Sequence, residues 1–308
     1  MKIDIAIIIP VHNRIETSKI GLKAIYDSVN FYKESKLNND KKTFNIQIIV
    51  VDDGSTDGTG DWIKDNFQEV TILNGNGNLW WSGSINVALN YIIDKDVKYV
   101  LLWNDDIRPA LNYFCVLHLW IYENKKEDTI VSSKVLWDDD SGQIFNVGCL
   151  FNPKTGKKTI LGLGKYDDDM IYKKTRDIDW CGGMGVLIPK KIIDEVGFFD
   201  EITFPQYHGD ADFMLRAKNK NKQIIVFPKL LIYNNRETTG TNNENLTMAI
   251  KSITKIGSNY NLKKDIEFYR RHSTSSFAYL ELIKKYKIFF IGAIRNSLSK
   301  MFIYERNS

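Results

Sequence analysis

Three short runs of the sequence are almost wholly apolar and rich in β-branched residues, at positions 5–10, 46–51 and 99–103. Continuous hydrophobicity over about five or six residues is typical of a strand buried on both faces, as in a parallel sheet. Stretches with helical periodicity accompany these runs, at residues 16–32, 57–67 and 82–93. The order strand–helix–strand–helix–strand–helix–strand predicts a doubly wound α/β fold, in which a mostly parallel central sheet is flanked by helices.

The second half of the chain mixes strand and helix patterns. We expect strands over residues 130–137, 177–189 and 224–228, and a helix over residues 208–220. The polar segment 33–42 is expected to be a solvated loop, and the chain is helical and basic from residue 242 onward. These patterns predict one α/β domain with two halves, residues 1–110 and 111–240, followed by a helical C-terminal extension, residues 241–308.

Composition excludes several classes of protein. The 308 residues are 43% hydrophobic and 26% charged, as in ordinary soluble proteins. The net charge of +4 is too weak to indicate a nucleic-acid partner. Cys115, Cys149 and Cys181 have neither a disulfide nor a metal-binding spacing, which suits a cytoplasmic protein. The apolar N-terminal run is too short for a signal peptide, and no uninterrupted run has the length of a membrane span.

The C-terminal segment 279–303 alternates apolar residues with basic ones. One interpretation is an amphipathic basic helix at a membrane surface, which would place the protein on the inner face of the cell membrane. A helix that packs back on its own domain explains the same pattern, and the sequence does not separate the two.

Polar residues follow each of the three apolar runs, in the segments PVHNR (10–14), VDDGSTD (51–57) and WNDDIRP (103–109). Ligands of open α/β sheets bind beyond the carboxyl ends of the strands, so these side chains are expected to converge on one site. A single acid at a strand end is usually a helix cap or a turn former, and we expect Asp57 to be one. Three polar strand ends in succession favour a shared binding site.

These segments, with NLWWSGSINVAL (78–89) and VGFFDEITFPQYHGDADFMLRA (196–217), resemble the ordered motifs of family 2 glycosyltransferases, which have the GT-A fold. The resemblance covers about residues 3 to 235. The last two segments look most like the bacterial branch that builds surface polysaccharides and includes rhamnosyltransferases. The resemblance implies that residues 1–110 bind a nucleotide-sugar and that residues 111–240 bind the acceptor.

The resemblance also implies roles for the residues at the strand ends. Asp53 matches the acid that binds the pyrimidine base, Asp105 the position near the ribose and donor sugar, and Asp106 the ligand of Mn²⁺ or Mg²⁺. A hard divalent cation with oxygen ligands suits a nucleoside diphosphate leaving group, and it needs few protein ligands. The alternative for the acids is a turn-forming Asn-Asp-Asp. The other donor-binding residues implied are Pro10, Val11, His12, Asn13, Asn78, Trp81, Gly83, Asn86 and Asn104.

Asp210 matches the base that deprotonates the acceptor hydroxyl in inverting enzymes of this family. Inversion needs a base on the face of the sugar opposite the leaving group, so base and metal ligand should come from different motifs. Asp212 lies two residues further on and would point elsewhere on a helix, where it can pair with Arg216 four residues later.

Two departures from the family pattern bear on the site. Gly209 precedes Asp210 where a Glu is usual, with His208 just upstream; His208 either has a polar role toward acceptor or metal, or caps the helix. Many relatives carry a metal-binding His after the later strand, where this chain has Asn234 and Asn235. Either an Asn carbonyl substitutes for it, or the metal is held by Asp106 and the diphosphate alone.

Several aromatic and basic residues have two interpretations. Of Trp80 and Trp81, we expect one at the pocket and one in packing, because indole rings both stack on sugars and fill cores. Arg270 and Arg271 either bind a diphosphate or form a solvated helix face. The acceptor-binding residues implied by the resemblance are Trp180, Gly182, Gly183 and His208.

The sequence therefore predicts an inverting, metal-dependent glycosyltransferase that uses a UDP- or dTDP-sugar and a hydroxyl of a cell-surface glycan or lipid-linked acceptor. The alternatives are a catalytically inactive glycan-binding subunit of a polysaccharide synthesis complex and, less in keeping with the residues, a sugar-nucleotidyltransferase. The latter chemistry uses a glycine-rich loop after the first strand, which this chain lacks.

Overall fold

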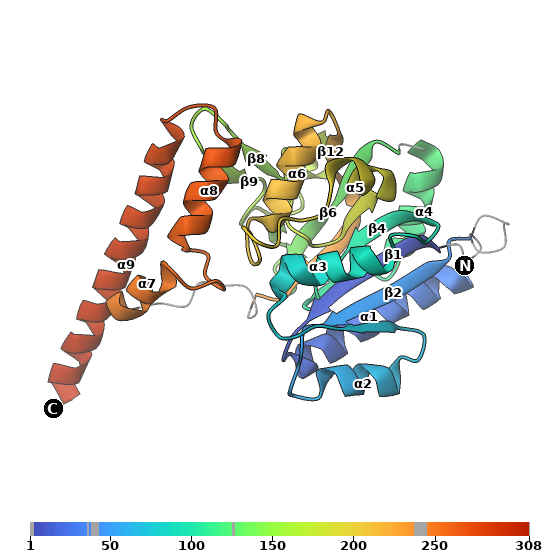
Figure 1. The fold of residues 1–308 in the computed structure, drawn as a ribbon, viewed down its shortest axis with the longest axis horizontal. Helices are drawn as coiled ribbons and strands as arrows, with labels where there is room; N and C mark the ends of the chain where they lie inside the picture. Colours follow the sequence, from blue (N-terminus) through green and yellow to red (C-terminus); the bar gives the residue numbers. More distant parts are fainter. Residues whose placement is uncertain (1–2, 36, 38–42, 125–126, 237–244, 308) are drawn as a thin grey trace.

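The computed structural model describes residues 3–35, 37, 43–124, 127–236 and 245–307. Within them, the main sheet has the strand order β10-β12-β6-β11-β4-β1-β2-β3, with β5 beside β12 and β7 beside β6. Figure 1 shows β4, β1 and β2 side by side. The first half supplies the parallel strands β1 (Ile3–Val11), β2 (Ile46–Asp52), β3 (Thr71–Asn74) and β4 (Val97–Leu102). This confirms the predicted doubly wound α/β fold.

The second half extends the same sheet with mixed strand directions. Its strands are β5 (Ile107–Pro109), β6 (Thr129–Trp137), β7 (Ile144–Asn146), β10 (Arg176–Asp177), β11 (Val186–Pro189) and β12 (Gln223–Asn234). β11 is antiparallel to both β4 and β6, whereas β6 and β12 are parallel. β8 (Cys149–Phe151) and β9 (Lys158–Ile160) form a separate two-stranded sheet.

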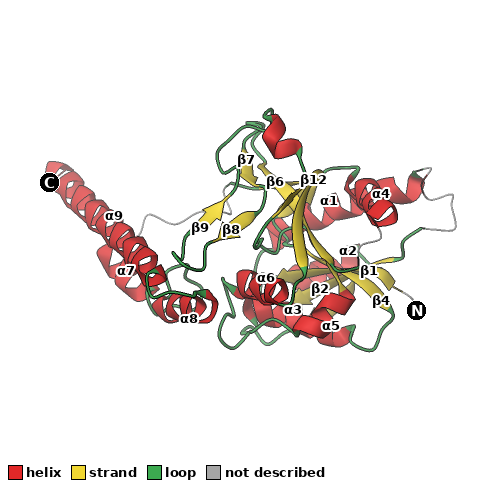
Figure 2. Ribbon diagram, turned by 90° about the horizontal axis from the view of Figure 1, so that it is seen from above, coloured by secondary structure: helices red, strands yellow, loops and turns green. Residues whose placement is uncertain are grey.

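Helices cover both faces of the sheet (Figure 2). α1 (Ile15–Glu34), α2 (Thr59–Asn66) and α4 (Tyr113–Asn124) pack on one face, and α3 (Trp80–Tyr91), α5 (Lys190–Val196) and α6 (Gly209–Asn219) on the other. Successive residues of β1 alternate between the two cores: Ile7 belongs to the α1 side and Ile8 to the α3 side, both fully buried. Burial on both faces explains the continuous hydrophobicity of the strands.

Two strand predictions need correction. Residues 177–189 are not one strand, because β10 ends at Asp177 and β11 begins only at Val186. The glycine-rich segment between them turns at Gly185. Glycine is favoured there because φ is +64° and because a Cβ would collide with the side chain of Ser133. The strand expected over 224–228 instead continues to Asn234, with a register shift after Phe227 that accommodates Pro228.

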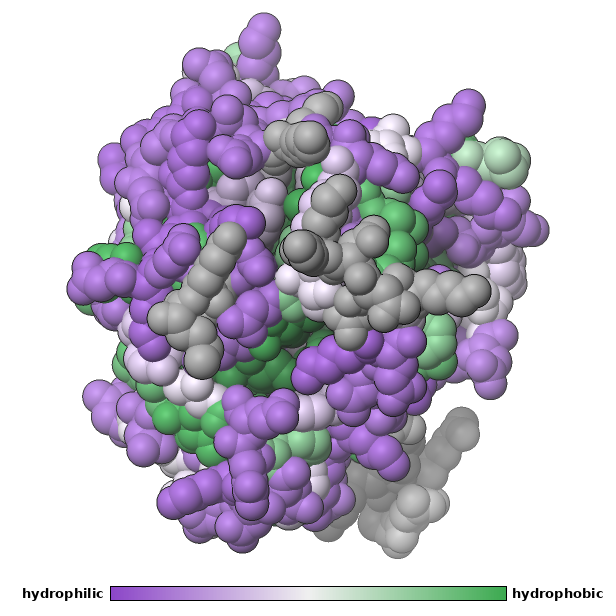
Figure 3. Space-filling model, turned by 90° about the vertical axis from the view of Figure 1, so that its right-hand side faces the viewer, coloured by the Kyte–Doolittle hydropathy of each residue, from purple (hydrophilic) through white to green (hydrophobic). Residues whose placement is uncertain are grey.

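The C-terminal extension consists of α7 (Leu246–Ser252), α8 (Leu262–His272) and α9 (Ala278–Asn307), which lie beside the domain (Figures 1 and 2). A third hydrophobic cluster joins Phe268, Ala278 and Leu282 of the extension to Ala211 and Leu215 of α6. The expected boundary at residue 240 lies outside the described residues. On the side of the molecule that carries the N-terminus, the surface is largely hydrophilic, with hydrophobic residues visible in a central hollow (Figure 3).

Candidate active site

A cavity of about 670 Å³ lies at the carboxyl ends of β1 and β4. Residues from several of the sequence motifs meet there. From the first half, the lining includes Pro10, Arg14, Trp81, Asn104, Asp105 and Asp106, and from the second half it includes Gln206, Tyr207 and Asn234. Strands whose polar ends are separated by about ninety residues in the sequence thus supply one site, as the parallel β1–β4 pairing requires.

Arg14 links the two acids that follow β4. Its guanidinium donates a hydrogen bond to the Oδ1 of Asp105 at 3.0 Å and to the Oδ2 of Asp106 at 2.9 Å. Asp105 is buried, and its Oδ2 accepts a second hydrogen bond from Ser18 at 2.8 Å. Burial raises the pKa of Asp105 to about 6, although the positive charge of Arg14 opposes the increase. Two neighbouring carboxylates can therefore coexist beside the cavity because Arg14 neutralises part of their charge.

The loops after β1 and β2 hold each other in place. The ring Nδ1 of His12 lies 2.6 Å from the carbonyl oxygen of Asp53, to which it donates in the matching tautomer. Asn13, whose φ is +49°, accepts the Thr56 N–H at 2.7 Å through its side chain. Asp57 accepts backbone N–H groups from Ile15 and Thr59, each at 3.0 Å, so it caps the first turns of α1 and α2 as expected.

Asp53 directly follows β2 in the sequence. Its side chain is buried against the N-terminal end of α3. Its carboxylate accepts backbone N–H groups from Gly77 at 2.8 Å, Leu79 at 2.9 Å and Trp80 at 3.0 Å. A carboxylate offers about four acceptor positions, so three of them are used within the protein. The side chain thus fixes the loop that precedes α3 and retains capacity for about one further donor.

Trp81 connects the cavity to the glycine-rich segment before β11. Its indole N–H donates to the Oδ1 of Asn104 at 3.1 Å, and its ring meets Phe199 edge-on at 5.5 Å. A Cβ on Gly183 would collide with the Trp81 ring, so only glycine permits this approach. Trp80 lies on the other side, where its ring packs against Gly257 of the extension. Trp81 is thus the pocket residue of the pair and Trp80 the packing residue, as expected.

Asp210 lies in the first turn of α6, and its Oδ1 accepts the Ala211 N–H at 2.7 Å. Gly182 is its neighbour, since an added Cβ there would lie 3.4 Å from the Oδ2 of Asp210. Burial raises the pKa of the Asp210 carboxyl, while hydrogen bonding and the charge of Lys158 oppose the increase. A carboxylate with a raised pKa is a stronger base, as proton abstraction from a hydroxyl requires.

The match to a known family lies in the first half of the chain. Residues 6–159, half of the sequence, match the family described as "Glycosyl transferase family 2". The chain belongs to glycosyl transferase family 2. No curated protein matches this glycosyltransferase in sequence.

Solved structures share the fold of this glycosyltransferase. A structure of GalNAc-T7 with UDP, GalNAc and Mn²⁺ aligns with a TM-score of 0.54 and 11% identity, over 93% of this chain and 57% of that one. Residues 1–349 of S. aureus TarS with UDP-GlcNAc align with a TM-score of 0.52 and 14% identity, over 94% and 79%. A longer TarS structure aligns with a TM-score of 0.51 and 15% identity, over 89% and 44%. The chain thus spans about half the length of the GalNAc-T7 chain and of the longer TarS chain. The structural similarity to these proteins confirms the GT-A fold.

The expected donor-binding residues of the glycosyltransferase that lie outside this cavity lining are Val11, His12, Asn13, Asp53, Asn78, Gly83 and Asn86. The amide of Asn86 is engaged by the loop 199–201, since it accepts the Phe199 N–H at 3.0 Å and donates to the carboxylate of Glu201 at 2.8 Å. Gly83 is buried inside α3, and Asn78 is exposed in the loop before it. Val11 is a buried core residue that contributes its backbone to the sheet.

The side chain of His208 is held by residues of β9 and α8 rather than by the start of α6. His208 occupies the position before α6 with a φ of +62°, yet its side chain makes no capping hydrogen bond. Its Nε2 lies 2.8 Å from the Oδ1 of Asp265 in α8, and its Nδ1 lies 3.1 Å from the Nζ of Lys158 in β9. Burial and the charge of Lys158 lower the pKa of His208 to about 3, so the ring is neutral. His208 thus caps α6 only through its backbone carbonyl, which accepts the Asp212 N–H at 2.7 Å, and its expected role toward the acceptor stays a prediction.

Sequence reasoning missed Arg14, Gln206 and Tyr207 of the cavity lining, and also Lys158, which lies near Asp210. The ammonium of Lys158 lies 3.6 Å from the Phe268 ring centroid and 5.8 Å from that of Trp180. Burial lowers the pKa of Lys158 to about 7, although the carboxylates of Asp265 and Asp210 oppose the decrease. The sequence gave little indication of a role for Lys158. It is the second of two successive lysines and begins β9, a three-residue strand that matches no motif.

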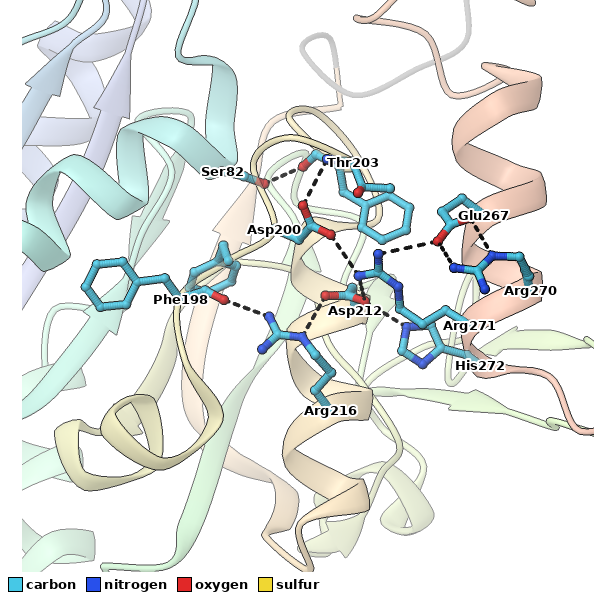
Figure 4. A network of polar contacts seen from close by, with 12 residues as sticks. Ser82, Phe198, Asp200, Thr203, Asp212, Arg216, Glu267, Arg270, Arg271 and His272 are labelled. Atoms are coloured by element: carbon cyan, nitrogen blue, oxygen red, sulfur yellow. Dashed lines mark hydrogen bonds and ion pairs between the residues drawn. The ribbon is translucent and has the colours of Figure 1, made fainter.

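Asp212 has no exposed surface and forms the centre of a polar network (Figure 4). Its carboxylate accepts hydrogen bonds from Arg216 at 2.8 Å, Arg271 at 3.0 Å and His272 at 2.9 Å. Burial would raise its pKa, but these partners outweigh the effect and lower it. The network fixes α6 against α8, which supports the expected scaffold role of Asp212. Arg271 contributes to this network, which neither alternative expected, whereas Arg270 is exposed and pairs with Glu267, as a solvated helix face predicts.

The residues around Asp106 fit a hard divalent cation only in part. Carboxylate and amide oxygens are suitable ligands, and Asp106 and Asn234 both line the cavity. However, the described residues contain no cluster of three or more His, Cys, Asp or Glu side chains that could hold a metal. A cation bound here would take its remaining ligands from the diphosphate and water, as Mg²⁺ commonly does.

Proposed function

We propose that the chain is an inverting, metal-dependent glycosyltransferase that transfers a sugar from a UDP- or dTDP-linked donor to a hydroxyl group. The observation that carries the proposal is the position of Trp81 and Gly183. They lie between the acidic cavity, which suits a nucleotide diphosphate, and the Gly182–Asp210 pair, which suits an acceptor hydroxyl. Base and diphosphate site come from different motifs and flank one short segment, which supports a base on the face of the sugar opposite the leaving group.

The donor would lie in the cavity at the ends of β1 and β4. Asp53 would select the pyrimidine base with its remaining acceptor position, beside Pro10, His12 and Asn13. Asp105 would face the ribose and donor sugar, and Asp106 with Asn234 would hold Mn²⁺ or Mg²⁺. When bound, the cation would neutralise the charge that develops on the nucleoside diphosphate.

Asp210 would accept the proton of the acceptor hydroxyl while that oxygen attacks the anomeric carbon of the donor. One displacement breaks the bond to the diphosphate and inverts the configuration, so no covalent intermediate is needed. Trp180 and His208 line the acceptor side in this proposal, with Gly182 and Gly183 keeping the approach open. We propose a bacterial surface glycan or a lipid-linked primer as acceptor, in a cytoplasmic protein of the rhamnosyltransferase-like branch.

The test separates binding from transfer. We expect UDP- or dTDP-sugars to raise the thermal unfolding midpoint more with Mn²⁺ than without it, and Asp106→Ala to remove the metal dependence. A glycan that binds while no nucleotide-sugar does would instead assign the chain to a glycan-binding subunit.

Asp210→Asn keeps the size and polarity of the side chain but removes the base. We expect donor affinity to stay within about twofold of wild type while transfer falls by about 10²–10⁴-fold, the usual contribution of a general base. Asp194→Asn is the matched control, because Asp194 is exposed and pairs with Lys190 on the surface of α5. Retained transfer in Asp210→Asn would remove Asp210 from the mechanism.

A further inference from the structure

α9 has two faces with different surroundings. One face packs on α7 and α8, and its residues Ala278, Leu282 and Ala293 are buried. On the same side, Phe289 stacks on Tyr260 with ring centroids 3.6 Å apart, and Tyr286 donates to the carboxylate of Asp265 at 2.8 Å. This face satisfies the alternative in which the C-terminal helix packs on its own protein.

The opposite face carries six large apolar side chains that are 40–62% exposed. At 100° per residue they fall within an arc of about 140°, so they form one continuous apolar stripe along the helix. We call this set the apolar stripe: Leu280, Ile283, Ile288, Ile291, Ile294 and Leu298. Isolated exposed apolar residues are normal, but a continuous stripe of this length indicates an interaction surface.

Basic side chains lie within the same arc. Lys284, Lys287 and Arg295 are exposed and fall between members of the stripe when placed at 100° per residue. The acid closest to them among the side chains that the structure describes on α9 is Glu281, which lies at the edge of the arc and 3.5 Å from Lys284. The face is therefore both apolar and cationic.

We propose that this face of α9 lies on an anionic lipid surface, with the apolar stripe inserted at the headgroup boundary. Lys and Arg extend their long apolar stems along such a surface and place their charges at lipid phosphates. A second copy of the chain fits less well, because pairing two such faces would bring three cations against three with Glu281 as the nearby acid on each described face. Among the described residues, no helix has the length and hydrophobicity to cross a bilayer, so α9 would lie along the surface.

The position of α9 gives this surface a consequence for the candidate active site. α8 contacts α9 on one side and α6, which carries Asp210, on the other (Figure 1). Lipid binding would hold the acceptor side of the protein near a membrane, where a lipid-linked acceptor resides. This consequence rests on the proposed function, whereas the lipid surface itself does not.

The experiment is flotation of the full chain with vesicles, which requires no catalysis. We expect binding to vesicles of equal parts phosphatidylglycerol and phosphatidylcholine, weaker binding at high salt, and little binding to phosphatidylcholine alone. Lys284→Gln/Lys287→Gln should weaken binding by about fivefold for each charge removed. Leu280→Ser/Ile291→Ser should weaken it by about tenfold or more while leaving the charges in place.

Matched controls lie on other surfaces. Lys23→Gln/Lys64→Gln removes two exposed lysines from α1 and α2, and Ile202→Ser removes an apolar residue that is 88% exposed; neither should change flotation. Absence of binding to anionic vesicles, or equal binding to neutral ones, would overturn the proposal. So would a dimer in sedimentation that Leu280→Ser/Ile291→Ser dissociates without any vesicle binding, since the stripe would then belong to a second copy.

Discussion

Arg14 shows how one residue makes an acidic site compatible with a folded protein. Asp105 is 3% exposed and Asp106 is its neighbour, so two carboxylates meet with little water to screen them. Arg14 bridges them with hydrogen bonds of 3.0 and 2.9 Å. Removing one partner of a buried ion pair costs more than removing an exposed one, because the remaining charge is left without compensation.

We predict that Arg14→Met lowers the free energy of unfolding by about 3 kcal/mol in the absence of divalent cations. Mn²⁺ should recover part of this loss if it binds the same carboxylates, whereas it should stabilise wild type less. Urea unfolding with and without Mn²⁺ measures both effects. Arg236→Met is the control, because the exposed pair of Arg236 with Asp139 should contribute less than about 1 kcal/mol. Equal losses in the two variants would contradict the prediction.

Lys158 should control the pH range in which Asp210 acts as a base. With a pKa of about 7, Lys158 is cationic below that pH, and its charge favours the ionised form of Asp210. Lys158→Met removes the charge, so the pKa of Asp210 rises and the onset of transfer activity moves to higher pH. We expect activity to fall by about tenfold at pH 6 and by less at pH 8.

The pH profile of transfer tests this role, because a merely structural loss would lower activity at all pH values alike. Lys157→Met is the control on the neighbouring, exposed residue, and it should leave the profile unchanged. An unshifted profile in Lys158→Met would show that Lys158 does not act on Asp210.

At the scale of elements, local patterns located three parallel strands of the first half, but neither β3 nor the contacts among the later segments. The runs at 5–10, 46–51 and 99–103 became β1, β2 and β4 because burial on both faces leaves a continuous hydrophobic signature. The short strands β5, β7, β8 and β9 have too few residues to show a period.

The candidate site was predictable where the family motifs lie, and less so where partners come from distant segments. The acids of the strand ends, Asp105 and Asp106, line the cavity with Trp81, as the motif resemblance implied. The contacts of His208 with Lys158 and Asp265 join residues 50 and 57 positions away in the sequence, so no local pattern could reveal them.

Asp265 links α8 to the start of α6 and to α9, since it pairs with His208 and with Lys285. Burial would raise its pKa, but these partners lower it to about 2. The ionised carboxylate therefore contributes stability above its ordinary pKa near 4, and this contribution is lost as the pH falls from about 4 to about 2.

We predict that Asp265→Asn lowers the free energy of unfolding at pH 7 by about 2 kcal/mol and that the variant loses less stability than wild type between pH 4 and pH 2. Urea unfolding across this pH range measures the difference. Asp194→Asn, at an exposed residue, should follow the wild-type curve within about 0.5 kcal/mol. A constant difference between wild type and Asp265→Asn from pH 7 to pH 2 would contradict the assignment.

At the scale of the whole molecule, the C-terminal extension and the glycosyltransferase domain share a core. Phe268 of α8 is fully buried between Phe151, Phe204 and the ring of His208, with centroid distances of 5.6, 6.3 and 4.7 Å. The Asp212 network and the Asp265 pairs cross the same junction. An interface that has an apolar core and is crossed by several ion pairs and hydrogen bonds predicts that the two parts unfold together rather than in sequence.

Phe268→Ala tests this cooperativity. We expect it to lower the free energy of unfolding of the entire chain by about 3–5 kcal/mol, because a large buried ring is replaced by a cavity. Circular dichroism reports the helices of both parts and tryptophan fluorescence reports the domain, because every tryptophan precedes residue 241. Joint unfolding should therefore give coincident urea transitions in both wild type and variant. Phe277→Ala, at an extension residue that is 70% exposed, should change stability by less than about 0.5 kcal/mol. A first transition that Phe268→Ala shifts, followed by a second that it leaves unchanged, would show that the extension folds as a separate unit and holds His208 only loosely.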